Sequence, residues 1–537
     1  MSTPPSTRTV LLRRGEVHSP ADPFATAMVV EAGHVAWVGS EGAADAFADG
    51  VDEVVDLDGA LVTPAFTDAH VHTTSTGLAL TGLDLTAARS RAEALTLVRE
   101  HATARPTDRV LLGHGWDAAR WPDRQPPTRA ELDEATGGRP VYLSRIDVHS
   151  AAVSTALLDL VPGVTDRPGH DPEGPLTRDA HHAVRAAALG AVGPQQRVEA
   201  QRAALRHAAS LGIGSLHECG GPDISSEDDF TGLLDLARSE PGPRVAGYWA
   251  DRDIERARGL GALGAAGDLF VDGSLGSHTA CLHEPYADAP HNGTAYLSAQ
   301  DVADHVVGCT EAGLQAGFHA IGDAAVTAVV DGMRAAAEKV GHARVRAARH
   351  RIEHAEMLTP ETVAAFAEFG LTASVQPAFD ALWGGEDGMY AERLGAERAR
   401  TLNPYAALLR AGVPLAFGSD SPVTPLDPWG TIRAAAFHRT PEHRVSVRAA
   451  FTAHTRGGWR AVGRDDAGVL VPGAPADYAV WRTDELVVQA PDDRVARWST
   501  DPRSGTPGLP DLTPGAQLPV CLRTVVFGQT VFVRPDE

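Results

Sequence analysis

Lysine and cysteine are scarce in this 537-residue sequence, and long apolar runs are missing from it. A single lysine, Lys339, stands among the 47 basic residues. The four cysteines are widely spaced and form no C-x-x-C pair, which excludes a disulfide scaffold, a zinc ribbon and a dithiol redox motif. No stretch approaches the roughly 18 apolar residues of a membrane span. We therefore expect a soluble protein with reduced thiols.

The charge of the chain is strongly negative. The 70 acidic residues outnumber the 47 basic ones, which gives a formal net charge of -23 at pH 7. Such a field repels nucleic acid and anionic membranes, which bind through Lys and Arg. We expect neither as a partner, and expect a small molecule instead. Arg13 and Arg14 are not followed by a long apolar run, so no secretory signal is visible and the expected location is the cytoplasm.

The middle of the chain has the pattern of an α/β protein. Strand-like segments that end in polar residues alternate with Ala-rich helical stretches, which is typical of βαβ units. Eight such strands indicate a closed (β/α)8 barrel of the TIM type. Outer helices are predicted over 198–210, 324–340 and 360–369. The predicted strands span 61–72, 214–218, 245–250, 269–273, 315–321, 350–356, 371–377 and 414–422.

Both ends of the chain carry short β-type runs, and we predict that they build one composite β-sandwich. Roughly 120 residues separate the first two barrel strands, far more than a usual βα connection, and they include strand-like runs at 109–113 and 140–143. We assign these residues to an inserted cap domain. The predicted domains are the first part of the sandwich (1–60), the first barrel strand (61–76), the cap (77–194), the remaining barrel (195–460) and the second part of the sandwich (461–537).

Asp68, His70 and His72 alternate at the end of an apolar strand, so a period of two aims all three side chains into the barrel mouth. An H-x-H pair of this kind can hold a divalent metal, and Asp68 or another group behind the rings could fix a ring tautomer. Taken alone, the pair is weak evidence, because the chain has 23 histidines and surface or core histidines are common.

Three later residues strengthen the prediction of a metal site. His319, His354 and Asp420 each fall where a predicted barrel strand ends, which is the end at which such barrels place their chemistry. Individually, either histidine could be structural and Asp420 could cap a helix. Together with His70 and His72, they form a set that can converge around one cation.

Further motifs accompany these residues. They are DAHVH (68–72), RIDVH (145–149), DGSLGS (272–277) with EPY (284–286), SVQP (374–377), GSDSP (418–422) and GVLVPGAPAD (468–477). With them, nearly the whole chain resembles the amidohydrolase superfamily, specifically amidohydrolase family 3, which includes N-substituted formamide deformylases. The resemblance implies the sandwich and barrel, a divalent metal that is usually zinc, and hydrolysis of a non-peptide C-N bond in a small amide or formamide. A homodimer is plausible by the same analogy.

One position departs from this family. Relatives often carry a lysine near the start of the fourth strand, carbamylated so that it bridges two metals, whereas Asp268 stands at the matching position here. An aspartate ends about four atoms short of a lysine carbamate, so it would bridge two ions only if the backbone moved inward, which strand packing resists. We therefore predict one metal ion, held by His70, His72, His319 and Asp420. Two ions, with His354 and Asp268 as further ligands, are the alternative.

The predicted mechanism follows from the metal. A bound zinc ion lowers the pKa of water from 15.7 to roughly 7 and polarises the scissile carbonyl. The resemblance also suggests Asp420 as the general base that passes the proton of the water to the leaving amine. His354 is then the second catalytic residue, which orients the water or polarises the carbonyl.

Substrate contacts are predicted for Trp116, Arg145 and His149 of the cap and for Gln376 at the end of the seventh strand. A buried polar network inside the cap is an equally good interpretation of the first three. Two rival functions also stand: a binding or regulatory protein that lost turnover, which the missing lysine keeps open, and an isomerase that uses the metal as a Lewis acid. Metal content and the gain of one water in the product would distinguish these functions.

Overall fold

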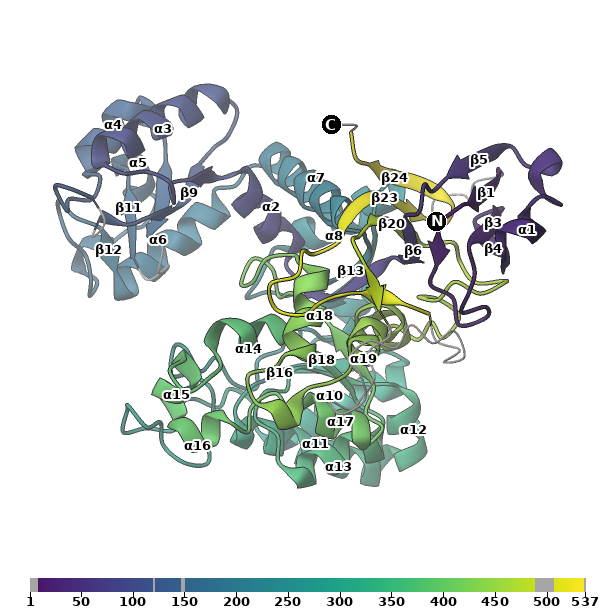
Figure 1. The fold of residues 1–537 in the computed structure, drawn as a ribbon. Helices are drawn as coiled ribbons and strands as arrows, with labels where there is room; N and C mark the ends of the chain where they lie inside the picture. The colour runs from purple at the N-terminus through teal and green to yellow at the C-terminus, as the bar shows by residue number, and fades with distance from the viewer. Residues whose placement is uncertain (1–7, 119–120, 146–149, 488–506, 536–537) are drawn as a thin grey trace. The chain divides into compact units, whose positions relative to one another are not determined.

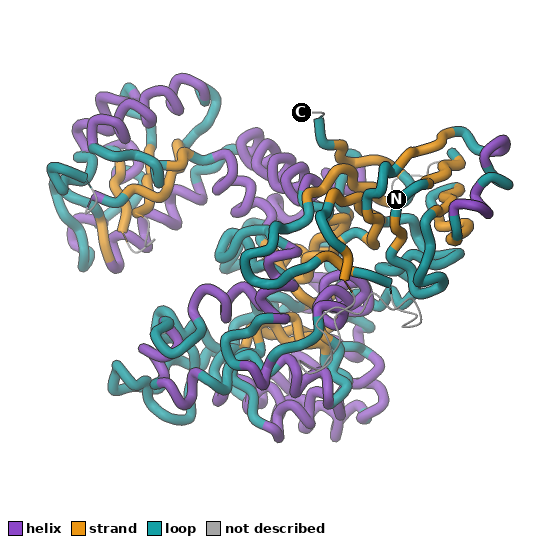
Figure 2. The backbone as a smooth tube through the Cα atoms, in the orientation of Figure 1, coloured by secondary structure: helices purple, strands orange, loops and turns teal. Residues whose placement is uncertain are grey.

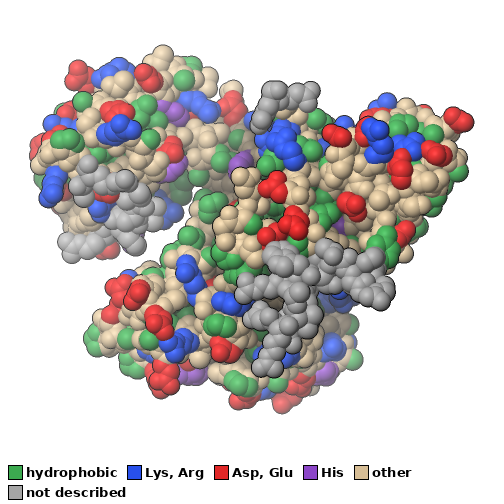
Figure 3. Space-filling view, viewed as in Figure 1, with side chains coloured by type: hydrophobic (Ala, Val, Ile, Leu, Met, Phe, Trp, Pro, Cys, Tyr) green, Lys and Arg blue, Asp and Glu red, His purple; other side chains and the backbone are tan. Residues whose placement is uncertain are grey.

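The computed structural model describes residues 8–118, 121–145, 150–487 and 507–535. Contacts between Cα atoms divide the chain into two compact units, Met1–His72 with Leu205–Glu537, and Thr73–Ala204. On the face that Figure 3 shows, acidic and basic side chains are interspersed over both units. Among the described residues, no helix is both long and apolar enough to cross a membrane.

The first unit contains the predicted barrel of eight parallel strands (Figures 1 and 2). Neighbouring strands in the barrel follow one another in the sequence, as right-handed βα repeats require. The prediction of a (β/α)8 barrel is therefore confirmed. Its strands are β7 (Phe66–Val71), β13 (Ile213–Gly220), β14 (Arg244–Trp249), β15 (Gly264–Ala265), β16 (Gln315–Ala320), β17 (Arg351–His354), β18 (Thr372–Val375) and β19 (Leu415–Phe417).

The ends of β7 and β19 are joined where the barrel closes. Val71 and Ser421 form a parallel bridge. On either side of it, the Asp420 N–H donates to the His70 carbonyl (2.8 Å) and the His72 N–H donates to the Ser421 carbonyl (3.0 Å). Because backbone bonds hold these two ends together, His70, His72 and Asp420 are brought to the same point of the rim.

The fourth strand differs from the prediction of 269–273. In β15, Gly264 pairs with both β14 and β16, Ala265 pairs with β16, and Phe270 makes a single bridge to His319. Between them the chain leaves the sheet at Gly267, whose φ of +91° is readily accessible only to glycine. The apolar run after Asp268 stays bonded to β16: the Leu269 carbonyl accepts the His319 N–H and the Val271 N–H donates to the His319 carbonyl, each at 3.0 Å.

Helices surround the barrel, and the three predicted ones are present as α7 (Pro194–Ser210), α11 (Asp323–Val340) and α13 (Pro360–Phe369). The bounds of α13 follow from its sequence. Thr359 and Thr362 form a capping box, Pro360 occupies the first turn, and Gly370 ends the helix at a φ of +63°. Further barrel helices are α8 (Glu227–Ser239), α10 (Ala299–Ala312), α14 (Pro377–Trp383), α17 (Tyr405–Arg410) and α18 (Pro428–Ala436).

The two ends of the chain share a β-sandwich, as predicted. Strand β20 (Tyr478–Arg482) from the C-terminal part pairs with β6 (Leu61–Pro64), and Val62 and Tyr478 contribute to one apolar core. The predicted strand at 61–72 is thus two strands, one in the sandwich and one in the barrel. The remaining sandwich strands are β1 (Thr9–Arg13), β2 (Glu16–Val17), β3 (Ala27–Glu31), β4 (His34–Gly39), β5 (Glu53–Asp56), β23 (Val520–Val526) and β24 (Gln529–Val533).

The second unit is an inserted domain with a sheet and a core of its own. Its sheet has the order β12-β11-β10-β9-β8, and Trp116 and Trp121 pack in its core. The limits of 77–194 given for it above stay a prediction. Its elements are α2 (Thr73–Thr81), β8 (Leu83–Asp84), α3 (Arg91–Ala104), β9 (Leu111–Trp116), α4 (Arg129–Thr136), β10 (Val141–Arg145), β11 (Ser150–Val153), α5 (Thr155–Leu158), β12 (Leu176–Thr177) and α6 (Arg178–Gly190).

Candidate metal centre

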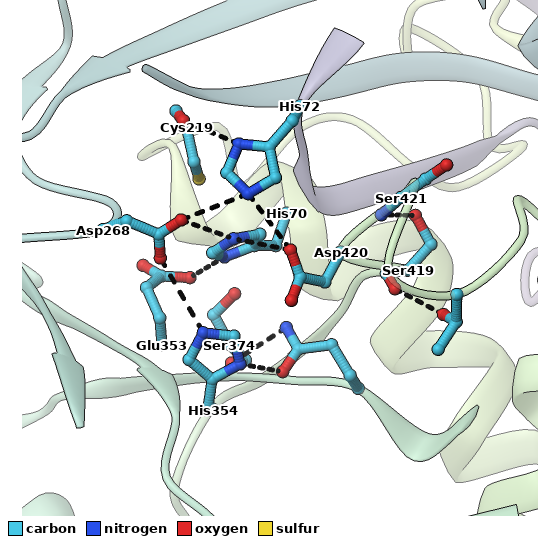
Figure 4. Close-up of polar contacts among 12 residues, drawn as sticks. His70, His72, Cys219, Asp268, Glu353, His354, Ser374, Ser419, Asp420 and Ser421 are labelled. Carbon is cyan, nitrogen blue, oxygen red and sulfur yellow. Dashed lines mark hydrogen bonds and ion pairs between the residues drawn. The ribbon is translucent and has the colours of Figure 1, made fainter. Parts of the chain in front are cut away.

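Three histidines and two aspartates converge at the carboxyl end of the barrel strands (Figure 4). His70 and His72 lie at the end of β7, Asp420 follows β19, Asp268 follows β15, and His354 ends β17. All but His72 are buried, and the His72 side chain is only 13% exposed. Metal-binding side chains from four strands therefore meet in a region that is largely shielded from water.

Four nitrogen-to-oxygen distances in this group have the length expected between ligands of one metal ion. The Nε2 atoms of His70 and His72 lie 3.4 and 3.2 Å from Asp268 Oδ2, and 3.4 and 3.1 Å from Asp420 Oδ1. Ligands at about 2.0–2.1 Å from a zinc ion are separated by about 3.3–3.4 Å. These two imidazoles and two carboxylates therefore have ligand atoms close enough to share a zinc ion.

Asp268 lies closer to the histidines than expected from the sequence. Strand packing was expected to resist an inward shift of the backbone here, yet after the turn at Gly267 the Asp268 carboxylate lies beside His70 and His72. Its second oxygen, Oδ1, faces His354 Nε2 at 3.7 Å. Asp268 is thus a further candidate ligand, and the one-ion set with His319 and the two-ion alternative both stay predictions.

His319 lies beside this group. Its ring packs edge-on against His354 with centroids 4.4 Å apart, and its Nδ1 atom lies 3.6 Å from Asp272 Oδ1. Asp272 is itself held by the backbone N–H groups of Cys281, Ile321 and Gly322. Among the described residues, His319 belongs to none of the groups whose ligand atoms all lie within 4.8 Å of one another. Its role as a metal ligand stays a prediction.

The ring of each of the three clustered histidines is oriented by an oxygen atom. A carboxylate, a peptide carbonyl and an amide oxygen can only accept, so each Nδ1 donates and each Nε2 presents its lone pair to the centre. His70 Nε2 is also buried without a hydrogen-bond partner. The pairs are His70 Nδ1 with Glu353 Oε2 (2.9 Å), His72 Nδ1 with the Cys219 carbonyl (3.0 Å) and His354 Nδ1 with Gln376 Oε1 (2.8 Å).

Asp68 does not hold a ring. Its Oδ1 accepts the backbone N–H groups of His70 (3.2 Å) and Ser419 (3.0 Å), so it joins the ends of the first and last strands. Burial raises its pKa to about 6. The group behind the His70 ring is Glu353, which the sequence reading missed. The sequence did carry a signal for Glu353: it stands two residues after Arg351, and two charged residues at alternate positions are unusual in a strand that is expected to be buried.

The charges of the group stabilise one another. Burial opposes ionisation of Asp268 and Asp420, but the imidazoles beside them lower the pKa of both carboxyls. Burial likewise opposes protonation of His70 and His72, yet the carboxylates raise the pKa of both rings well above the ordinary value. Protonated rings balance the two carboxylates, and a divalent cation bound here would displace these protons.

A second group of close donors, His70, Cys219 and Glu353, is not a metal site. Arg351 donates to both oxygens of Glu353, at 2.5 and 2.9 Å, and lowers the pKa of this buried carboxyl to about 2. The guanidinium already supplies the positive charge at this position. Burial raises the pKa of the Cys219 thiol, which keeps it a neutral, small buried side chain.

The backbone is strained at the site itself. His354, Ala355 and Asp420 have φ values of +68°, +46° and +56°, in the left-handed region that side chains other than glycine rarely adopt. Such conformations persist where the surrounding structure imposes them, and they cluster at functional sites. In His354 and Asp420 the strained residue is itself a member of the cluster.

The four predicted substrate contacts stay predictions, and the structure shows the surroundings of three of these residues. Trp116 is 2% exposed and donates its indole N–H to the Leu143 carbonyl, so it is a core residue of the inserted domain with almost no surface to offer a ligand. Gln376 is also 2% exposed, and its side-chain oxygen accepts a hydrogen bond from His354 Nδ1. Arg145 lies 3.5 Å from Asp117 with 35% of its side chain exposed, and its contact with substrate stays a prediction. His149 lies outside the described residues.

A cavity lies elsewhere in the first unit. It has a volume of about 430 Å³ and is lined by Arg238, Arg244, Arg464 and Phe527, among others. Arg244 begins β14, so this cavity adjoins the amino end of the strands, whereas the donor atoms converge at the carboxyl end. The chemistry of the donors, and not cavity size, identifies the site.

Comparisons with known proteins agree with this geometry. The model of the Amidohydrolase family matches residues 53–532. Protein LONG AFTER FAR-RED 3 of Arabidopsis thaliana is 30% identical over 86% of this chain and 84% of its own, and N-substituted formamide deformylase of Arthrobacter pascens is 24% identical over 86% and 91%. The crystal structure of a metal-dependent hydrolase from Pyrococcus furiosus superposes with a TM-score of 0.75, at 28% identity, over 89% of this chain and 99% of that one. The chain therefore belongs to the Amidohydrolase family.

Proposed function

We propose that this metal-dependent hydrolase cleaves a non-peptide carbon–nitrogen bond of the amide or formamide type in a small molecule. The observation that carries the proposal is the convergence of two imidazole nitrogens and two carboxylate oxygens, 3.1 to 3.4 Å apart, at the carboxyl end of the barrel. The similarity to N-substituted formamide deformylase over most of both chains supports the choice of bond.

The proposed cofactor is one zinc ion held by His70, His72, Asp268 and Asp420. When bound, such an ion polarises a carbonyl group and lowers the pKa of water. The chain supplies the ligands in the required form, since the Nδ1 atoms of His70 and His72 face acceptors and both aspartates are carboxylates. In the alternative arrangement, Asp268 and His354 would hold a second ion.

Asp420 is the proposed proton carrier. Its side chain is 10% exposed, against 5% for Asp268, so water reaches Asp420 more easily. In the proposed reaction the water oxygen bonds to the substrate carbonyl carbon while the Asp420 carboxylate takes its proton. The carbon–nitrogen bond then breaks, and Asp420 passes the proton to the leaving nitrogen, so that an acid and an amine are released.

His354 is the proposed positioning group for the water or the substrate carbonyl. Gln376 holds its Nδ1 atom, and the Phe379 ring stacks on it with centroids 6.0 Å apart and an interplanar angle of 10°. The ring therefore has one free nitrogen, Nε2, and this nitrogen faces the side of the cluster formed by Asp268. An imidazole fixed in this way can donate or accept one hydrogen bond at a defined place.

The test is hydrolysis of an amide and formamide panel by the zinc-loaded protein, with product masses and metal content measured together. We expect one zinc ion per chain and products that together exceed the substrate by one water. Zinc binding without turnover across the panel would favour a binding or regulatory protein. A product with the mass of the substrate would indicate an isomerase.

A further inference from the structure

Arg351 is a fully buried arginine on the inward face of the barrel. It is 0% exposed and lies two residues before Glu353 on β17, so the two side chains share a face of the strand. Its guanidinium contacts four other barrel strands. These contacts are the Ala69 carbonyl on β7 (2.6 Å), His217 Nδ1 on β13 (3.2 Å), the Tyr248 ring on β14 (4.3 Å) and Ser374 Oγ on β18 (2.9 Å).

Glu353 connects this arginine to the metal centre. Its Oε1 accepts from Arg351 Nε at 2.5 Å, and its Oε2 accepts both from Arg351 Nη2 and from His70 Nδ1, each at 2.9 Å. Figure 4 shows the Glu353 carboxylate behind the His70 ring, on the side away from Asp420. An unbroken series of bonds thus runs from the guanidinium through the carboxylate to the imidazole that faces both Asp268 and Asp420.

We infer that Arg351 and Glu353 are positioning residues that set the metal affinity of His70. The inference rests on the proposed function, because it concerns the proposed zinc ligand. Glu353 fixes the proton of His70 on Nδ1 and increases the basicity of Nε2, as carboxylates behind metal-binding histidines do. Arg351 donates to both oxygens of Glu353, so it fixes the carboxylate behind the His70 ring and supplies the partner charge that a buried carboxylate requires.

His70 differs in this respect from its neighbours. His72 donates to a neutral peptide carbonyl and His354 to a neutral amide, whereas His70 donates to a charged group. Hydrogen bonds to ionised partners are roughly twice as strong as neutral ones. Since His70 also approaches both aspartates at 3.4 Å, its orientation decides how well the four donors fit one ion.

A purely structural role makes a different prediction. In that role, Arg351 would only stabilise the barrel interior through its contacts with Ala69, Tyr248 and Ser374. Its loss would then lower thermal stability and leave zinc affinity unchanged. The inference predicts a loss of affinity that is traceable to His70.

The decisive variant replaces both charges, R351M/E353Q. Removing the pair together leaves no uncompensated buried charge, so the barrel should fold more readily than with E353Q alone. We expect the zinc dissociation constant, measured by competition with a chromophoric chelator, to rise about 10- to 100-fold. The matched control is S374A, which removes another bond to Arg351 without touching Glu353 or His70; its zinc affinity should be that of the wild type.

A second readout reports on the ring itself. In the cobalt-loaded protein, proton NMR detects the exchangeable ring N–H groups of ligating histidines as strongly shifted signals. R351M/E353Q should lose or shift one of these signals, and S374A should keep them all. Unchanged zinc affinity and unchanged signals in the double variant would overturn the inference, while a wild-type chain that binds no divalent metal would overturn the proposed function as well.

Discussion

Asp268 Oδ2 lies 3.2 Å from His72 Nε2, although the two residues follow the fourth and the first strand of the barrel. This contact exists because the chain leaves the sheet at Gly267 and carries the carboxylate inward. The turn thus brings the Asp268 carboxylate to the two histidines of the proposed metal site.

Replacement of Asp268 by asparagine should abolish tight zinc binding. The variant keeps the size of the side chain but removes one of two negative charges from a buried site that has two neutral ligands. We expect the zinc content of purified D268N, measured by inductively coupled plasma mass spectrometry, to fall from about one ion per chain to a small fraction. D331N, at an exposed aspartate paired with Arg334, should keep its zinc. Full zinc content in D268N would remove Asp268 from the ligand set.

The backbone turn at Gly267 should affect zinc binding as much as the Asp268 side chain that it positions. Alanine at this position would be strained at a φ of +91°, and its Cβ would approach Cys219 to 3.3 Å. G267A should lower both the melting temperature and the zinc affinity. G341A is the control, because Gly341 has a similar φ of +93° but open space around it. G341A should lose stability of about 1 kcal/mol and keep its zinc affinity; equal zinc affinity in the two variants would contradict the argument.

Replacement of Asp420 by asparagine should stop turnover while the chain stays folded. The amide cannot take a proton from water, and loss of a general base typically costs about 10²- to 10⁴-fold in rate. The measurements are kcat on the best substrate of the panel, circular dichroism, and zinc content at saturating zinc. A variant that retains full zinc and wild-type turnover would exclude Asp420 as the proton carrier.

Replacement of Gln376 by leucine distinguishes one metal ion from two. The change leaves His354 Nδ1 without its acceptor at 2.8 Å and frees the ring to turn. If His354 only positions the reactants, Q376L should reduce kcat about 10- to 100-fold and leave the zinc content unchanged. A drop from two zinc ions to one would instead show that His354 binds a second ion.

A pH-dependent contribution to stability is expected from Asp380, away from the metal centre. Burial raises the pKa of this carboxyl from 3.8 to about 6, while burial lowers the pKa of the neighbouring His438 to about 3. The folded chain then binds the Asp380 proton more tightly than the unfolded chain does, so stability falls as the pH rises through the window from about 4 to 6.

The variant D380N removes this titration and can still accept the Arg439 N–H that Asp380 Oδ2 accepts at 2.8 Å. The difference in melting temperature between D380N and the wild type, measured by scanning calorimetry, should therefore shift in favour of D380N as the pH is raised from 5 to 8. A difference between the two proteins that does not change over this pH range would mean that Asp380 ionises normally.

Much of this architecture was predictable because it depends on local pattern. The alternation of apolar and polar residues in His70-Val-His72 indicates which side chains face the barrel interior, and the count of strand ends indicates eight strands. The capping signals at Thr359, Pro360 and Gly370 likewise define a helix from a few neighbouring residues. Such patterns persist in the fold because each is set by interactions within one turn or one strand.

The composition and motifs of the sequence by themselves determined the fold class, the family and the histidines of the site. Only the tertiary structure decided that Asp268 joins them, that Glu353 and not Asp68 holds the His70 ring, and that Trp116 is a core residue. The physical reason is that these contacts join residues up to 283 positions apart. They depend on strand register and on the point where a short strand such as β15 ends, which no local pattern encodes.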